Sequence, residues 1–135
     1  MANVSCTPGK PGVKNGSRAK GDVTGIIAMN SPQGNCSLAI SFESDAIFNI
    51  TNKMLGESVS SIDDTVTDLV GEVTNMATGN AKLLLESDGY DFTMATPIVV
   101  KGAGHEIKHA VEGKIIVIPF ETGAGKFYIE VGFDR

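Results

Sequence analysis

A carboxylate and an amide lie one turn apart in the longest helix that the sequence predicts. Asn75 follows Glu72 by three residues and Asp68 precedes Glu72 by four, so a helix places all three side chains on one face. A carboxylate can pair with a cation on a partner, whereas a neutral amide donates and accepts hydrogen bonds and cannot act as a general base. The spacing therefore indicates a face that binds and orients other groups.

Two glycines interrupt the same helix. Gly71 and Gly79 each cost about 1 kcal/mol relative to alanine in a helix interior. Because small residues beside a carboxylate and an amide let another backbone come close, we interpret this face as a docking face. In the alternative interpretation, the acidic residues only complement the positive N-terminus of the helix. That explains Asp63 and Asp64 well, but Glu72 lies more than two turns further on.

The helix that carries these residues is predicted to run from about Ile62 to Ser87. Its apolar side chains recur at helical spacing and predict a buried stripe made of Val66, Leu69, Val70, Val73, Met76 and Ala77. A shorter helix is predicted before it, with Ser44 as the N-cap and Gly56 as the stop signal. The stripe would turn the polar face of the long helix away from the core.

Segments of period-two alternation on both sides of the helices predict strands. Residues 2–7 predict a short strand, 22–30 and 35–42 a hairpin, 94–102 and 105–113 a second pair, and 114–120 with 126–133 a final hairpin. Strands, two helices and further strands in this order favour the α+β class with a largely antiparallel sheet. No linker divides the chain, so residues 1–135 are predicted to form a single domain.

The sequence also repeats itself at an offset of 91 residues. The shift superimposes Ile26-Ile27 on Val117-Ile118, Gly34 on Gly125, Leu38 on Ile129, Ile40 on Val131 and Phe42 on Phe133. Both copies end in the same hairpin, and the first copy's long helix would lie before residue 1. We therefore expect a domain without its first helix, with an apolar surface left exposed or covered by another protomer. A chance match of two apolar hairpins is the alternative.

The composition excludes several classes of protein. A chain of 135 residues with 41% hydrophobic and 20% charged residues is typical of a globular domain. The net charge of −5 argues against nucleic-acid binding. The sequence contains no membrane span and no signal peptide, so a cytoplasmic location is predicted. Cys6 and Cys36 are interpreted as reduced thiols, and His105 and His109 lack the third ligand that a metal site would need.

The ordered set of polar residues resembles the signature of the CheC/CheX/FliY family of phosphatases. That signature has an acidic residue or serine, a glutamate and an asparagine spaced D/S-x3-E-x2-N, followed further along the chain by a proline. Asp68, Glu72, Asn75 and Pro97 fill the four positions here. The flanking runs at 19–27, 53–57, 104–107 and 118–128 are similar to the CheX branch, and the resemblance covers nearly the whole chain.

The resemblance implies a CheC-like fold and an enzyme that removes the phosphoryl group from the aspartate of a phosphorylated CheY-like response regulator. It implies that Asn75 orients the attacking water and that Glu72 pairs with the regulator's active-site lysine. The docking surface would be shaped by the remaining positions: Asp68, Gly71, Gly79 and Pro97. Mg²⁺ is expected in the regulator's acidic pocket, with no metal or cofactor in this chain. The resemblance also implies a homodimer formed by sheet pairing.

Two other interpretations stay open. The same face could dock a receiver domain or a flagellar-switch component without catalysis. The chain could also be a non-functional fragment because the first helix is missing. Binding to a regulator with an unchanged phosphate half-life would favour the docking module.

Overall fold

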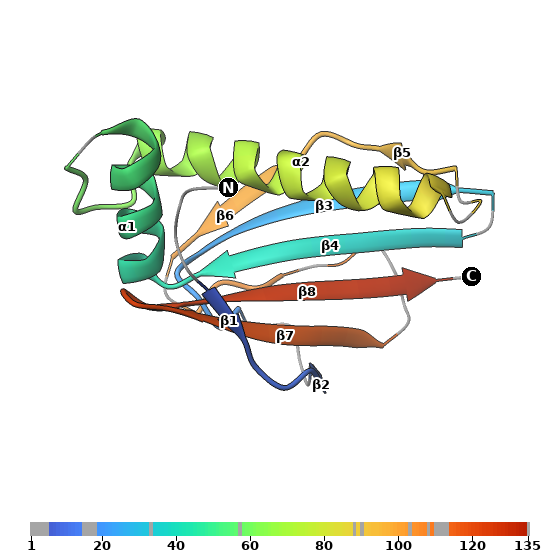
Figure 1. Ribbon diagram of the computed structural model, residues 1–135, viewed down its shortest axis with the longest axis horizontal. Coiled ribbons are helices and arrows are strands. Elements are labelled where there is room, and N and C mark those ends of the chain that lie inside the picture. The colour runs from blue at the N-terminus through green and yellow to red at the C-terminus, as the bar shows by residue number, and fades with distance from the viewer. Residues whose placement is uncertain are drawn as a thin grey trace.

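The sheet that carries the helices is assembled from both ends of the chain. The computed structural model describes residues 6–14, 19–32, 34–56, 58–87, 89, 91–102, 104–107, 109 and 114–134. The strands are β1 (Cys6–Pro8), β2 (Gly12–Val13), β3 (Val23–Ser31), β4 (Gly34–Phe42), β5 (Thr93–Met94), β6 (Ile98–Lys101), β7 (Ile115–Thr122) and β8 (Lys126–Asp134). Helices α1 (Ser44–Leu55) and α2 (Asp64–Ser87) follow β4 and lie on one side of the sheet (Figure 1).

Every strand pairing among the described residues is antiparallel. The order is β1-β7-β8-β4-β3-β5, with β2 also paired to β7 and β6 also paired to β3. Ala39 of β4 lies opposite Glu130 of β8 at the centre of the sheet, and these two residues are 91 positions apart. The register of the β3–β4 hairpin recurs at the same offset in β7–β8. The sequence repeat is therefore a structural one, and the predicted α+β class is confirmed.

The predicted pairing of residues 94–102 with 105–113 is wrong. β6 pairs with β3 instead, and the described residues of 105–113 form no strand, only an isolated bridge at Glu106. The described residues His105 and His109 instead contact the back of the sheet, the side away from the helices: His105 Nε2 lies 2.6 Å from Thr24 Oγ1, and His109 Nδ1 lies 2.6 Å from Ser37 Oγ. A segment that turns alternate residues toward a sheet produces the same period-two pattern as a strand within it.

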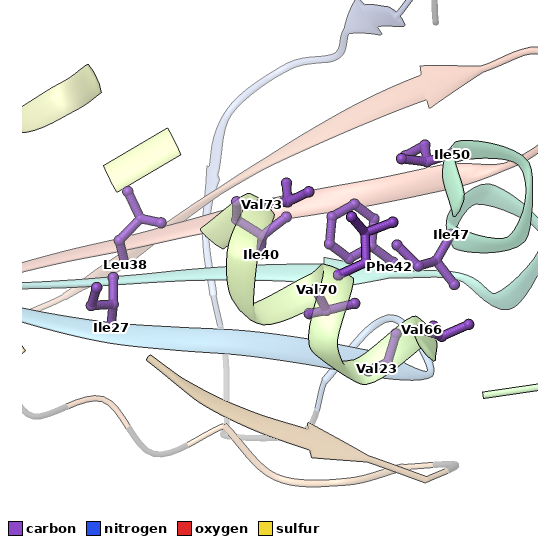
Figure 2. Close-up of a cluster of buried hydrophobic side chains, with 11 residues drawn as sticks. Val23, Ile27, Leu38, Ile40, Phe42, Ile47, Ile50, Val66, Val70 and Val73 are labelled. Atoms are coloured by element: carbon purple, nitrogen blue, oxygen red, sulfur yellow. The ribbon is translucent and has the colours of Figure 1, made fainter. Parts of the chain in front are cut away.

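The core lies between the helices and the front of the sheet (Figure 2). Its buried apolar cluster draws on β3, β4, α1 and α2: Val23, Ile27, Leu38, Ile40, Phe42, Ile47, Ile50, Val66, Leu69, Val70 and Val73. The predicted stripe of α2 is thus confirmed, with Ala77 packed against the cluster. Met76 is the exception, since it is 41% exposed. It follows Glu72 by four residues and so shares the solvent side of the helix.

Carboxylates satisfy the N-termini of both helices. Ser44 is the first residue of α1 rather than its N-cap, and its backbone N–H and hydroxyl both donate to Asp22 Oδ2 at 2.9 Å. Asp63 Oδ1 accepts from the Val66 N–H at 3.1 Å at the start of α2. Gly56 ends α1 as predicted, with a φ of 66° that favours glycine.

The half of the sheet formed by β7 and β8 is less covered than the half beneath α2. α2 packs mainly on β3, whereas α1 reaches β8 only near one end of the strand (Figure 1). Ile116 of β7 and Phe133 of β8 are exposed.

A buried polar network holds the covering segments against the back of the sheet. Glu130 is fully buried, and its two carboxylate oxygens accept from Lys14 Nζ at 2.9 and 2.8 Å. His109 Nε2 donates to Glu130 Oε1 at 2.9 Å, and His109 Nδ1 lies 2.6 Å from Ser37 Oγ. Burial by itself raises the pKa of Glu130, but the hydrogen bonds and charges of His109 and Lys14 lower it below its usual value.

Cys36, the two histidines and the two helices can each be compared with what the sequence predicts. Cys36 is a buried free thiol whose pKa is raised by burial; the side chain of Cys6 lies outside the described part. His105 and His109 have separate hydrogen-bond partners, and no cluster of three or more potential metal ligands occurs among the described residues. Neither helix in this part of the chain combines the length and apolarity that a membrane crossing requires.

Candidate functional site

Asp68, Glu72 and Asn75 all lie on the solvent side of α2. Each is exposed, whereas Val66 and Val70 on the opposite side are fully buried. Within the part of the chain that the structure describes, the three polar side chains make no hydrogen bond or ion pair. The geometry therefore leaves a carboxylate and an amide, one turn apart, available to a partner.

The position of Asn75 is set by the residue before it. Thr74 is fully buried against Gly25 of β3, where an added Cβ would stand 2.9 Å from Thr74 Cβ. Thr74 Oγ1 donates to the Val70 carbonyl and Thr78 Oγ1 donates to the Thr74 carbonyl, each at 2.7 Å. These buried hydroxyls are thus satisfied inside the helix. The glycine lets α2 lie close to β3, and Asn75 follows on the outer side.

The two helix glycines differ in their surroundings. An added Cβ at Gly71 would stand 3.4 Å from Val99 Cγ2, at ordinary van der Waals contact, so this glycine faces β6. An added Cβ at Gly79 would meet nothing within 4 Å. Gly79 therefore has the open surroundings that the close approach of another backbone needs.

Pro97 lies at the start of the strand that flanks α2. It is partly buried and directly precedes β6, whose Val99 reaches the helix at Gly71. Figure 1 shows β6 next to α2 on the outer side of β3. The pairing of β6 with β3 thus places Pro97 one residue before the strand whose Val99 contacts Gly71 of α2.

Sequence reasoning missed two apolar residues of this face. Met76 and Leu83 are 41% and 64% exposed. At about 100° per residue, both fall within about 40° of Glu72 around the helix axis. Apolar character alone predicts burial for both, whereas their spacing of four and eleven residues from Glu72 predicts exposure. The spacing from Glu72 is therefore the sequence feature that could have predicted the exposure of both residues.

The fold and this helix face define a class of α+β proteins with a CheC-like fold. A CheC-like superfamily protein from Shewanella sp. PV-4 is 54% identical to this chain with a TM-score of 0.92, and the match covers 100% of this chain and 88% of that one. The chemotaxis protein CheX from Vibrio vulnificus is 45% identical with a TM-score of 0.91, covering 99% and 89%. The family described as chemotaxis phosphatase CheX matches residues 23–121. The chain belongs to the CheX family.

A more distant structure contains a partner. The CheX–CheY complex with BeF3 and Mg²⁺ from Borrelia burgdorferi is 21% identical to this chain with a TM-score of 0.80, and the match covers 100% of this chain and 86% of that one. At this identity the likeness concerns the fold. No curated protein matches the sequence closely enough to count as a relative.

Proposed function

We propose that this protein is a phosphatase that hydrolyses the aspartyl phosphate of a phosphorylated CheY-like response regulator. The description of its family as a chemotaxis phosphatase supports the reaction, and the Borrelia burgdorferi complex of CheX with CheY supports the class of partner. The observation in this chain that carries the proposal is the face of α2. There Glu72 and Asn75 are exposed one turn apart, with no side-chain partner among the described residues.

Hydrolysis of an aspartyl phosphate depends more on the positioning of water than on a covalent intermediate with the phosphatase. A water oxygen attacks phosphorus in line with the bond to the regulator's aspartate, and that bond breaks. The aspartate leaves as a carboxylate, and both hydrogens of the water end on the released phosphate. Such a step is accelerated by holding the water in line and by stabilising charge. Mg²⁺ in the regulator's own acidic pocket would supply part of that stabilisation.

Asn75 suits the placement of the water. Its amide oxygen can accept from the water while its NH₂ group donates to a phosphoryl oxygen. Because the amide is neutral, it can approach an anionic phosphoryl group that would repel a carboxylate. It stands on a helix held close to the sheet by Thr74 and Gly25, so its position is set before the partner binds.

Glu72 suits recognition of the partner. Its exposed carboxylate lies one turn from Asn75 and can pair with the lysine beside the regulator's phosphorylated aspartate, which fixes the register of docking. Asp68 adds a second negative charge on the same face. Gly71, Gly79 and Pro97 would shape the surface on which the regulator rests. Homodimerisation and a cytoplasmic location stay predictions.

The test compares loss of phosphate from a CheY-type regulator, charged with acetyl phosphate in Mg²⁺, in the presence of wild type and variants. Asn75→Ala should reduce the acceleration about 100-fold, because misplacement of a reacting group is this costly. Glu72→Gln should mainly raise KM. Asn80→Ala is the matched control, since Asn80 is an exposed asparagine of the same helix that lies off the face. Its activity should equal that of wild type.

Three outcomes separate the candidate functions. Loss of activity in Asn75→Ala and not in Asn80→Ala supports the phosphatase. Binding of the regulator by wild type without any change in phosphate half-life would replace the phosphatase with a non-catalytic docking module for a response regulator or flagellar-switch component. Acceleration that survives in both Asn75→Ala and Glu72→Gln would overturn the assigned residue roles.

A further inference from the structure

The polar face of α2 continues into an exposed apolar surface toward the C-terminal end of the helix. Met76 and Leu83 are 41% and 64% exposed, and both lie within about 40° of Glu72 around the helix axis. Gly79, with nothing within 4 Å of an added Cβ, lies between them. At 1.5 Å per residue, Leu83 stands about 16 Å along the axis from Glu72. This helix side thus carries Asp68 and Glu72 toward one end, and Met76 and Leu83 near the Lys82–Glu86 ion pair toward the other.

Core packing does not account for Leu83. The neighbouring Leu84 follows Ala77 by seven residues, so it points in the direction of the buried stripe of α2. Leu84 is nevertheless 72% exposed. Leu83 lies about 20° from Glu72 and about 40° from Leu69, the nearest buried residue of the stripe around the helix axis, and it is 64% exposed. An exposed leucine that aligns with Glu72 rather than with the core is available for burial by a partner.

The charges on this face of α2 indicate the charge and polarity of the partner's surface. Asp68 and Glu72 present two carboxylates without partners among the described residues, so the complementary surface at that end is cationic. Between Met76 and Leu83 the charged residue of the helix is Lys82, which pairs with Glu86 at 3.1 Å, and the open space at Gly79 allows close approach. Because Lys82 already has a partner of opposite charge, Met76 and Leu83 are the groups left for an apolar surface to cover.

We propose that Met76 and Leu83 form a second docking point for the regulator. This inference rests on the proposed function and names a property of its partner: an apolar patch about 16 Å from the lysine that meets Glu72. A contact so far from Glu72 and Asn75 fixes the orientation of the regulator on α2 more firmly than those two neighbouring contacts do by themselves. The apolar contact discriminates between regulators and does not take part in the chemical step.

The test uses two adjacent leucines of similar exposure. Leu83→Gln and Leu84→Gln are compared in single turnover and steady state with a CheY-type regulator charged with acetyl phosphate. Leu83→Gln should raise KM about tenfold, equivalent to about 1.4 kcal/mol, and leave kcat unchanged. Leu84→Gln should leave both unchanged. Leu83→Met, which keeps an apolar side chain, should leave KM close to the wild-type value.

Binding measured without turnover separates affinity from catalysis. In an Asn75→Ala background, the Kd for the same phosphorylated regulator should rise about tenfold with Leu83→Gln and stay constant with Leu84→Gln. Equal effects of the two glutamine variants, or none from Leu83→Gln while wild type is active, would overturn the second docking point and leave the phosphatase standing. Absence of any acceleration by wild type would instead overturn the proposed function. Circular dichroism checks that each variant is folded.

Discussion

Replacing Gly25 with alanine tests whether the contact between α2 and β3 sets the position of Asn75. The new Cβ would stand 2.9 Å from Thr74 Cβ, whereas ordinary contact begins at 3.4 Å, so the helix must move away by about 0.5 Å or more. Thr74 Oγ1 also donates to the Val70 carbonyl, and this hydrogen bond is disturbed if the side chain turns away. Over-packing by one methyl group costs about 1–3 kcal/mol. We expect a loss of stability in that range.

The assay has two parts because stability and activity answer different questions. Urea unfolding followed by circular dichroism gives the free energy of unfolding. Dephosphorylation at saturating regulator gives kcat, which we expect to fall at least tenfold, since a displacement of about 1 Å can cost 100-fold. Combining Gly25→Ala with Thr74→Ala removes Oγ1 and Cγ2 from the contact and should restore part of both quantities.

Two results would refute this reasoning. An unchanged free energy of unfolding in Gly25→Ala would mean that the close contact at Thr74 does not limit the helix position. A loss of stability with an unchanged kcat would mean that the contact supports the fold without positioning Asn75. Gly79→Ala is the control for stability, because its Cβ meets nothing within 4 Å in the same helix.

Four further predictions concern single side chains. Gly79→Ala should raise the free energy of unfolding by up to about 1 kcal/mol and raise KM for the regulator; an unchanged KM would remove Gly79 from the docking face. Lys14→Met should cost about 3 kcal/mol, because it leaves a buried carboxylate with one donor fewer; urea unfolding measures this loss. The lowered pKa of Glu130 stabilises the fold fully above about pH 4.5 and progressively less as pH falls through the folded value, so Glu130→Gln should flatten acid unfolding there. Asp22→Ala should cost about 1 kcal/mol, because the N–H of Ser44 loses its acceptor, and thermal unfolding would detect it.

Local spacing by itself predicts the candidate face of α2. Asp68, Glu72 and Asn75 share one side because a helix brings positions three and four apart together whatever surrounds it. The same rule applied to Met76 would have placed it beside Glu72, but its apolar side chain suggested the core. Burial depends on where a helix side points relative to the sheet, and one residue at the edge of the stripe does not decide that.

The cap of α1 and the position of residues 105–113 depend on residues far away in the chain, so local patterns do not predict them. The acceptor for the Ser44 N–H is Asp22, 22 residues earlier, so no local pattern could indicate that cap. The alternation in 105–113 predicts a strand, although His105 and His109 in fact contact hydroxyl and carboxylate groups on the back of the sheet. A covering segment and a strand present the same periodicity, and only the pairing of β6 with β3 separates them.

The sequence by itself determined the α+β class, the repeat at an offset of 91, the two helices and the positions of Glu72 and Asn75 on one face. These properties follow from periods of two and 3.6 residues and from identities at a constant offset, which are local or linear. The tertiary structure decided the contact of Thr74 with Gly25, the burial of Glu130 and the exposure of Leu83. Each of these depends on packing between segments distant in sequence, and periodicity carries no information about which distant residues meet.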